Sequence, residues 1–293
     1  MIIAVTGASG FLGKKLILRI LQKTKHNVLA ITSNFEAWEH IKNRHRIKVI
    51  NRYDFNKIKE EKIDVLINCA FPRNEDGMEM AKGLNYIKDI FEIVADSKIK
   101  AVINISSQSV YSSKRGLAAI ETDSLNLETK YAVGKYASEL MTNIICSKIN
   151  HTNIRLASLI GPEFNQRVVN KMIRKALDVN RIEALDGNMQ YGFMDVDDAA
   201  DGILAIVDKI NIEFKEIYNL GSEKSYTLLQ IANEIASTLQ KYNQKIVVES
   251  KESDQVYNSA LNSMLFFNEF GFKAQISLCE SIEKIYMKIK SER

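Results

Sequence analysis

The chain has 293 residues, of which 46% are hydrophobic and 26% charged, with three cysteines and a formal net charge of +4. This composition excludes a collagen-like, disulfide-stabilised or disordered chain, and the charge is too small for the footprint of a nucleic-acid-binding protein. No apolar run reaches the roughly 18 residues that a membrane-spanning helix needs. Because the first expected strand begins at Ile2, there is no room for a signal peptide, and we expect a cytoplasmic protein with reduced thiols.

Short apolar runs alternate with helical patterns through the first half of the chain. The runs expected to form buried strands are Ile2–Thr6, Val28–Thr32, Ile47–Asn51, Val65–Ala70, Ala101–Ser106 and Asn153–Leu159. Apolar residues at helical spacing predict helices over Phe11–Gln22, Phe35–Lys42, Met78–Ala95 and Lys130–Ser147. The alternation predicts an α/β fold of Rossmann type, with a doubly wound parallel sheet covered by helices on both faces.

The pattern is less regular after Gly161-Pro162. We expect helices near 164–178, 197–209, 227–240, 260–268 and 277–290, and strands near Ile182–Leu185, Ile217–Leu220 and Lys245–Glu249. No Gly-, Pro- or Ser-rich linker separates the two halves. We therefore expect a dinucleotide-binding domain over 1–163, to which 189–220 returns, and a smaller interleaved α/β substrate-binding region over 164–188 and 221–293. The active site is expected in the cleft between them.

A glycine-rich segment, Gly7-Ala-Ser-Gly10-Phe-Leu-Gly13, directly follows the first expected strand and opens the first expected helix. Gly7 permits the tight turn, Gly10 lets a pyrophosphate approach the backbone, and Gly13 lets the helix pack closely on the sheet. A dinucleotide's phosphates can then bind the free amides at the positive end of the helix. The segment is not a Walker A loop, because Lys14 is followed by Lys15 rather than by Ser or Thr.

Tyr131 and Lys135 lie four residues apart on an expected helix that follows a strand ending in Ser106-Ser107. Residues i and i+4 share a helix face, so the ammonium of Lys135 can lower the pKa of the Tyr131 phenol from about 10 towards neutrality. A phenol tuned in this way can exchange a proton with a carbonyl or alcohol. Ser107, at the end of the fifth strand, can hydrogen-bond the same oxygen.

These segments together resemble the extended short-chain dehydrogenases/reductases, in the nucleotide-sugar branch of the NAD-dependent epimerase/dehydratase family. The family's G-x-x-G-x-x-G matches Gly7–Gly13, its Y-x-x-x-K matches Tyr131/Lys135, and its S-S-x-x-V-Y segment matches Ser106–Tyr111. The resemblance implies a catalytic set of Ser107, Tyr131 and Lys135. It implies cofactor contacts from Gly7, Ser9, Gly10, Phe11, Leu12, Gly13, Thr32, Ser33, Asn34, Asp54, Ala70, Phe71, Asn85, Lys135 and Ser158. The substrate contacts that it implies are Arg73, Ser107, Tyr131, Ser158 and Tyr191.

Two departures from the family pattern bear on the reaction. Dehydratases carry T-D-E where this chain has Ser107-Gln108-Ser109, so the acid that removes water is missing and dehydration is not expected. The arginine that usually grips the substrate pyrophosphate is replaced by Tyr191, and a later arginine has no counterpart near 254–261. Arg167, Lys171, Arg174 or Arg181 could supply the positive charge from new positions.

Cofactor preference depends on the end of the second strand, where NAD enzymes place an acidic residue that binds the ribose hydroxyls. Here that place reads Thr32-Ser33-Asn34, which favours NADP(H) slightly over NAD(H). The four histidines form no ligand cluster, so no metal is expected. By resemblance, the chain is also expected to form a homodimer through the helices at 78–95 and 130–147.

The expected activity is reduction of a 4-keto-6-deoxy nucleotide sugar, with Tyr131 as the proton donor. The relatively short C-terminal region favours this reaction slightly over 4-epimerisation of a nucleotide sugar, which uses the same residues. Two further alternatives are reduction of a small uncharged ketone or aldehyde, which the missing arginines would explain, and a non-catalytic dinucleotide-binding role, which an intact Ser107, Tyr131 and Lys135 argue against.

Overall fold

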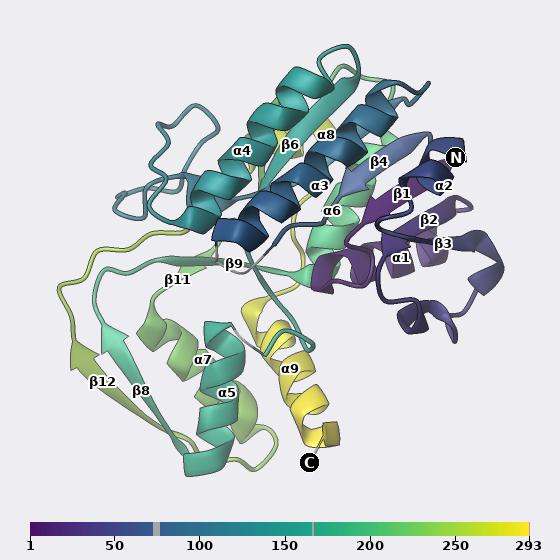
Figure 1. Ribbon diagram of the computed structural model, residues 1–293. Coiled ribbons are helices and arrows are strands. Elements are labelled where there is room, and N and C mark those ends of the chain that lie inside the picture. The colour runs from purple at the N-terminus through teal and green to yellow at the C-terminus, as the bar shows by residue number, and fades with distance from the viewer. Residues whose placement is uncertain (73–76, 166, 293) are drawn as a thin grey trace.

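The computed structural model describes residues 1–72, 77–165 and 167–292. Its centre is a parallel sheet whose strands lie in the order β10-β6-β5-β4-β1-β2-β3 (Figure 1). In that order they are β10 (Ile217–Leu220), β6 (Asn150–Leu156), β5 (Ala101–Ser107), β4 (Val65–Asn68), β1 (Ile2–Thr6), β2 (Asn27–Thr32) and β3 (Ile47–Asn51). The chain winds outward in both directions from β1 and β4, so a crevice is expected at the carboxyl ends of these two neighbouring strands.

Helices cover both faces of this sheet, which explains why its strands are almost continuously apolar. One face packs against α1 (Phe11–Lys23), α6 (Val196–Asp208) and α8 (Met264–Phe270). The other packs against α2 (Phe55–Glu60), α3 (Gly77–Ala95) and α4 (Lys130–Ile145). Because α8 contributes Phe266 and Phe270 to the core beside the sheet, the last third of the chain belongs partly to this layer.

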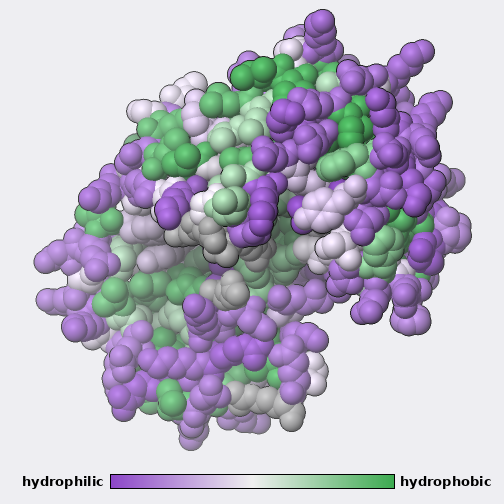
Figure 2. Space-filling view, in the orientation of Figure 1, coloured by the Kyte–Doolittle hydropathy of each residue, from purple (hydrophilic) through white to green (hydrophobic). Residues whose placement is uncertain are grey.

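A second hydrophobic core lies beyond the carboxyl edge of the sheet (Figure 1). It is formed by α5 (Val168–Val179), α7 (Leu228–Gln240) and α9 (Leu278–Glu292) around the parallel pair β8 (Arg181–Asp186) and β12 (Val247–Glu252). A three-stranded sheet of β11 (Ser225–Tyr226), β9 (Tyr191–Asp195) and β7 (Ser158–Ile160) joins the two parts. Between them the surface is hollowed (Figure 2).

The α/β fold with a parallel Rossmann-type sheet, predicted from the sequence, is confirmed, and the elements differ from prediction in a few places. The predicted helix over Phe35–Lys42 is only a 3-10 turn at Glu36–Trp38, held by the fully buried Trp38 while Phe35 is exposed. The predicted strand Asn153–Leu159 begins earlier and divides at Ala157 into β6 and β7, which belong to different sheets. The short elements α2, β9 and β11 were not predicted. Within the described residues, no helix is both long and apolar enough to cross a membrane.

Candidate active site

Three glycines build the turn between β1 and α1. Gly7 has φ of +60°, in the left-handed region that favours glycine, and a Cβ there would lie 2.9 Å from the main-chain nitrogen of Ala70. A Cβ at Gly13 would lie 2.3 Å from the carbonyl oxygen of Gly7. Side chains at these positions would therefore force α1 away from the loops that follow β1 and β4, and the glycines keep the amides of the first turn of α1 close to the crevice.

A cavity of about 550 Å³ opens at this turn. Its size, its glycine backbone and the adjacent helix N-terminus fit a dinucleotide. Eight residues predicted to contact the cofactor line it: Gly7, Ser9, Gly10, Phe11, Leu12, Gly13, Ala70 and Phe71.

The end of β2 lies next to this cavity without lining it. The hydroxyl oxygen of Thr32 lies 2.7 Å from that of Ser9, and it accepts a hydrogen bond of 3.1 Å from the main-chain N–H of Asn34. Ser33 is exposed. The segment therefore presents hydroxyl and amide groups, and no carboxylate, beside Ser9.

Two further residues that sequence matching assigned to the cofactor, Asp54 and Asn85, also lie outside the cavity lining. Asp54 caps α2 and pairs with the Lys57 ammonium at 2.8 Å, and the hydrogen bond from that ammonium lowers the pKa of Asp54. Asn85 is exposed on α3. Four residues of α3 line the cavity, Glu79, Lys82, Gly83 and Tyr86, and their spacing places them on a different side of the helix from Asn85. A Cβ at Gly83 would lie 2.4 Å from Cγ of Pro72, so glycine lets the loop after β4 pack against α3.

Arg52, which the sequence analysis did not select, lines the same cavity immediately after β3. Its guanidinium lies 4.9 Å from the ring centre of Tyr53 and 4.4 Å from that of Tyr86. Its buried Nε has no hydrogen-bond partner, and within the described part of the chain Arg52 forms no ion pair. The signal available in the sequence is its position as the first cation after the third strand.

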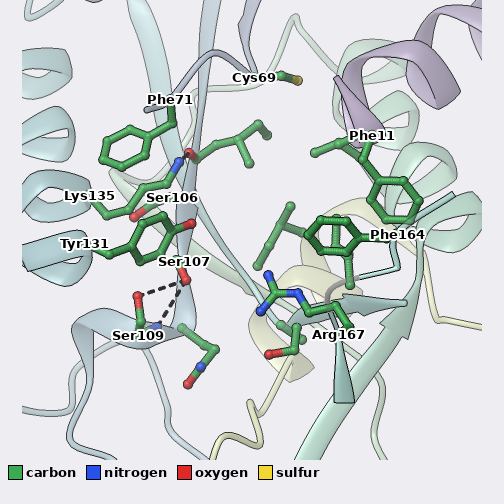
Figure 3. A pocket seen from close by; sticks show the side chains of 17 residues that line it. Phe11, Cys69, Phe71, Ser106, Ser107, Ser109, Tyr131, Lys135, Phe164 and Arg167 are labelled. Atoms are coloured by element: carbon green, nitrogen blue, oxygen red, sulfur yellow. Dashed lines mark hydrogen bonds between the residues drawn. The ribbon is translucent and has the colours of Figure 1, made fainter. Parts of the chain in front are cut away.

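A second cavity of about 400 Å³ is continuous with the first, because Phe11, Leu12, Cys69 and Phe71 line both. It contains the three predicted catalytic residues: Ser107 from the end of β5, and Tyr131 and Lys135 from α4. The hydroxyl of Tyr131 points toward Ser107 (Figure 3). The fold thus brings a serine and a tyrosine separated by a long loop to one side of a single cavity.

Local capping fixes the backbone that carries Ser107 and Tyr131. Ser107 caps a 3-10 turn at Gln108–Val110, and its Oγ accepts hydrogen bonds from Ser109 N at 3.2 Å and from Ser109 Oγ at 3.0 Å (Figure 3). Helix α4 begins after Thr129, whose hydroxyl accepts from Ala132 N at 3.1 Å. Tyr131 therefore lies in the first turn of α4, at the edge of the cavity.

Lys135 is buried and lines the second cavity. It donates a hydrogen bond of 2.7 Å to the carbonyl oxygen of Ile105 and lies 4.1 Å from the ring centre of Phe71. The same Phe71 ring packs edge-on against Tyr131, with 5.3 Å between ring centres. Burial raises the pKa of the nearby Cys69 thiol to about 12, against the opposing charge of Lys135, so Cys69 is not a thiolate nucleophile at neutral pH.

Arg167 reaches into this cavity from the side opposite Ser107 and Tyr131 (Figure 3). Its guanidinium lies 4.9 Å from the ring centre of Phe164, which in turn stacks on Phe11 at 4.8 Å. The other cations considered for this role lie elsewhere. Arg174 pairs with Glu292, Arg181 pairs with Glu249, and Lys171 lines a separate shallow pocket.

Of the remaining predicted substrate contacts, one lines the catalytic cavity, one does not, and one lies outside the described residues. Ser158, at the start of β7, lines the catalytic cavity. Tyr191 is not among the residues that line it, and packs against Tyr257 and Phe193 with ring centres 4.9 and 6.1 Å away. Arg73 lies outside the described residues.

A buried polar network supports the wall that carries Ser107. Arg155 makes two hydrogen bonds to the Glu139 carboxylate, at 3.0 and 2.7 Å, and a third, of 2.9 Å, to the Tyr111 hydroxyl. Ser106 also donates to Glu139, and Tyr111 donates to Asn219 at 2.9 Å. The network ties α4, β5, β6 and β10 together beside the predicted catalytic residues.

These groups can move a proton at a substrate oxygen. When bound, a nicotinamide dinucleotide supplies or takes up hydride, and the glycine turn with Lys135 is the part of the chain that would hold it. Tyr131 can give a proton to a carbonyl oxygen or take one from an alcohol, while Ser107 hydrogen-bonds the same atom. Gln108 and Ser109 provide no acid for the removal of water.

Comparisons with known proteins identify the family to which the chain belongs. Residues 3–221 match the NAD dependent epimerase/dehydratase family. The chain is 25% identical to a Bacillus subtilis protein described as an uncharacterized UDP-glucose epimerase, over 80% of each chain. It is 21% identical to the dTDP-4-dehydro-6-deoxyglucose reductase of Escherichia coli, over 98% of this chain and 97% of the reductase.

Among solved structures, the UDP-glucuronic acid 4-epimerase of Bacillus cereus in complex with UDP-glucuronic acid and NAD superimposes with a TM-score of 0.83. The two chains are 22% identical and each is fully covered. With the family match over most of the chain, the Rossmann-type sheet and the Ser107–Tyr131–Lys135 site, the protein is an enzyme of the NAD dependent epimerase/dehydratase family, among the extended short-chain dehydrogenases/reductases.

Proposed function

We propose that this enzyme reduces a 4-keto nucleotide sugar, of the 6-deoxy kind, by hydride transfer from a nicotinamide dinucleotide. The observation that carries the proposal is the meeting of Ser107, Tyr131 and Lys135 in one cavity, opposite Arg167 and without an acid at positions 108 and 109. The ketone and NAD(P)H, with one proton from Tyr131, give the alcohol and NAD(P)⁺. The sheet part holds the dinucleotide, and the part around α5, α7 and α9 holds the sugar nucleotide.

Arg167 is the residue that supports an anionic substrate. It forms no ion pair within the described residues, and its aromatic support holds the guanidinium in the cavity. A guanidinium in a partly apolar cavity attracts a phosphate or carboxylate strongly. This favours a sugar nucleotide over a small uncharged ketone, and the complete catalytic set favours an enzyme over a non-catalytic dinucleotide-binding relative.

The proposed cofactor is NADP(H). Thr32, Ser33 and Asn34 place no carboxylate where one would repel a 2′-phosphate, and Arg52, which forms no ion pair with the described residues, supplies a cation in the adjacent cavity. In a reductase the oxidised dinucleotide must leave after each turnover and be replaced by the reduced form.

A second candidate is 4-epimerisation of a nucleotide sugar, which is favoured by the similarity to the Bacillus cereus 4-epimerase. The same residues would first take the proton from the C4 hydroxyl and later return it. In that case the dinucleotide stays bound and is not consumed.

The proposal also includes a cytoplasmic homodimer. The exposed apolar side chains Val133, Leu140 and Ile144 lie on α4, which packs beside α3 on the outer face of the sheet part. Light scattering at micromolar concentration tests this assembly, and a monomer would contradict it.

The reaction is tested by mixing the protein with NADPH or NADH and a panel of UDP- and dTDP-linked 4-keto sugars. Stoichiometric loss of reduced cofactor supports the reductase. Conversion of a 4-hydroxyl sugar nucleotide without net change in cofactor supports the epimerase. Replacing Tyr131 by Phe should lower turnover by about 10²–10⁴-fold while leaving cofactor binding intact, and unchanged turnover would reject the catalytic assignment.

A further inference from the structure

The two lone pairs of Ser107 are both occupied by one neighbour. Ser109 donates to the Ser107 Oγ twice, from its main-chain N–H at 3.2 Å and from its own hydroxyl at 3.0 Å (Figure 3). A serine hydroxyl has two acceptor positions and one hydrogen. Ser107 therefore has one hydrogen-bonding capacity left, the donation of its own hydrogen.

The direction of that hydrogen matters because the Tyr131 hydroxyl, on the same side of the cavity, points toward Ser107 (Figure 3). With both lone pairs filled, Ser107 cannot accept a hydrogen bond from Tyr131. It can donate to the Tyr131 oxygen in the free enzyme, and to the oxygen on the reacting carbon when substrate is bound. A donor fixed in advance toward a developing negative charge is the kind of group that lowers a reaction barrier.

We propose that Ser109 is a positioning residue, which holds Ser107 as a permanent hydrogen-bond donor toward the oxygen that exchanges its proton with Tyr131. The proposal rests on the catalytic roles given above for Ser107 and Tyr131. In the sequence analysis, Ser109 was noted only because it stands where the dehydratases carry an acidic residue. Without the Ser109 hydroxyl, one lone pair of Ser107 becomes free, and Ser107 can turn to accept from Tyr131 instead.

Three other groups that can carry charge line the cavity, and a change at Ser109 leaves all three in place. Lys135 approaches from the same helix as Tyr131, Arg167 from the opposite side, and Cys69 from the loop after β4. A change in the titration of Tyr131 on altering Ser109 is therefore expected to come through Ser107.

The first test is a titration that needs no substrate. Phenolate absorbance is followed against pH in each variant and in the same variant carrying Tyr131→Phe, and the difference isolates Tyr131 from the other ten of the chain's 11 tyrosines. The loss of one donated hydrogen bond should move the half-titration point of Tyr131 upward by about half to one pH unit in Ser109→Ala. Ser109→Thr, which keeps the hydroxyl, should titrate like the unaltered protein.

A Ser107→Ala background separates action through Ser107 from direct action. There, adding Ser109→Ala should change the titration of Tyr131 no further. Equal half-titration points in the unaltered protein and Ser109→Ala would overturn the proposal. So would a shift of the same size in the Ser107→Ala background, because Ser109 would then act on Tyr131 by another route.

With a substrate in hand, kcat in Ser109→Ala should fall about tenfold while KM changes less than about twofold. Ser107→Ala should lose about 10²–10³-fold in kcat, and the double variant no more than that. Thermal unfolding midpoints identify any variant that is merely misfolded. Ser109→Thr, which also changes the side chain but keeps the hydroxyl, shows whether the loss in Ser109→Ala comes from the missing hydroxyl. Retained turnover in Tyr131→Phe would instead reject the proposed function, whatever Ser109 does.

Discussion

The buried pair of Arg155 and Glu139 gives the sharpest prediction about stability. Both side chains are 2% exposed, and the guanidinium binds the carboxylate through two hydrogen bonds. Replacing Arg155 by Met leaves Glu139 charged in the interior, with Ser106 still donating to it. Removal of one partner of such a pair costs about 3–5 kcal/mol, because the remaining charge is neither solvated nor neutralised. We expect Arg155→Met to lose that much free energy of unfolding.

The control is the double variant Arg155→Met/Glu139→Leu, which removes both charges. Its free energy of unfolding should recover most of the loss, since the pair itself contributes little beyond avoiding an unpaired charge. Urea unfolding without added cofactor measures both variants, so that ligand binding does not contribute to stability. A loss below about 1 kcal/mol in the single variant, or an equal loss in the double one, would refute this reasoning.

Three further predictions concern the cofactor site and the contact between the two parts. Arg52→Met should weaken NADPH binding about 10–100-fold, the equivalent of a charged hydrogen bond, and leave NADH nearly unchanged; an unaltered NADPH/NADH affinity ratio in a fluorescence titration would contradict this. Gly13→Ala should abolish dinucleotide binding in the same titration, because the new Cβ would lie 2.3 Å from the Gly7 carbonyl oxygen; retained affinity would argue against the turn as the phosphate site. Burial acts to raise the pKa of Asp197, but hydrogen bonds from lysines, above all Lys284, hold it below its usual value. The stability that this pair contributes should therefore be present above the unfolded-state pKa of about 3.9 and be lost as pH falls through the lower folded value. In Asp197→Asn, the free energy of unfolding measured in urea should therefore fall less steeply with decreasing pH in the acid range. The same pH dependence as in the unaltered protein would count against the pairing.

Features that depend on local chain geometry were predictable from the sequence. The glycine turn follows a strand and opens a helix within a few residues, so its spacing alone fixes which backbone groups face the crevice. Tyr131 and Lys135 share a face because a helix places residues four apart together. In both places the structure has the predicted element, and the residues line the two connected cavities.

Features that depend on register or on distant packing were not predictable. Asp54 was assigned to the cofactor by its match to the family's motif, and the structure adds that its carboxylate caps α2. Asn85 was also assigned by matching, and it is exposed on α3, where the residues that line the cavity are Glu79, Lys82, Gly83 and Tyr86. Arg167 was one of four cations, with Lys171, Arg174 and Arg181, that the sequence offered as a partner for an anionic substrate. The choice among them follows from the Phe11–Phe164 stack, which joins residues far apart in the chain.

The same limit applies to the catalytic pair. Tyr131, Tyr53 and Tyr286 are each followed by a lysine four residues later, so the spacing by itself does not identify a site. Tyr53 is 66% exposed outside a helix, and Tyr286 packs against Tyr242 in the second hydrophobic core, with 4.8 Å between ring centres. Only Tyr131 lies where a helix start meets the end of a central parallel strand, and only there does the lysine of the pair lie buried beside a cofactor-sized cavity among the described residues. The spacing of tyrosine and lysine therefore occurs at three places in this chain, and the topology of the sheet is what distinguishes the predicted site from the other two.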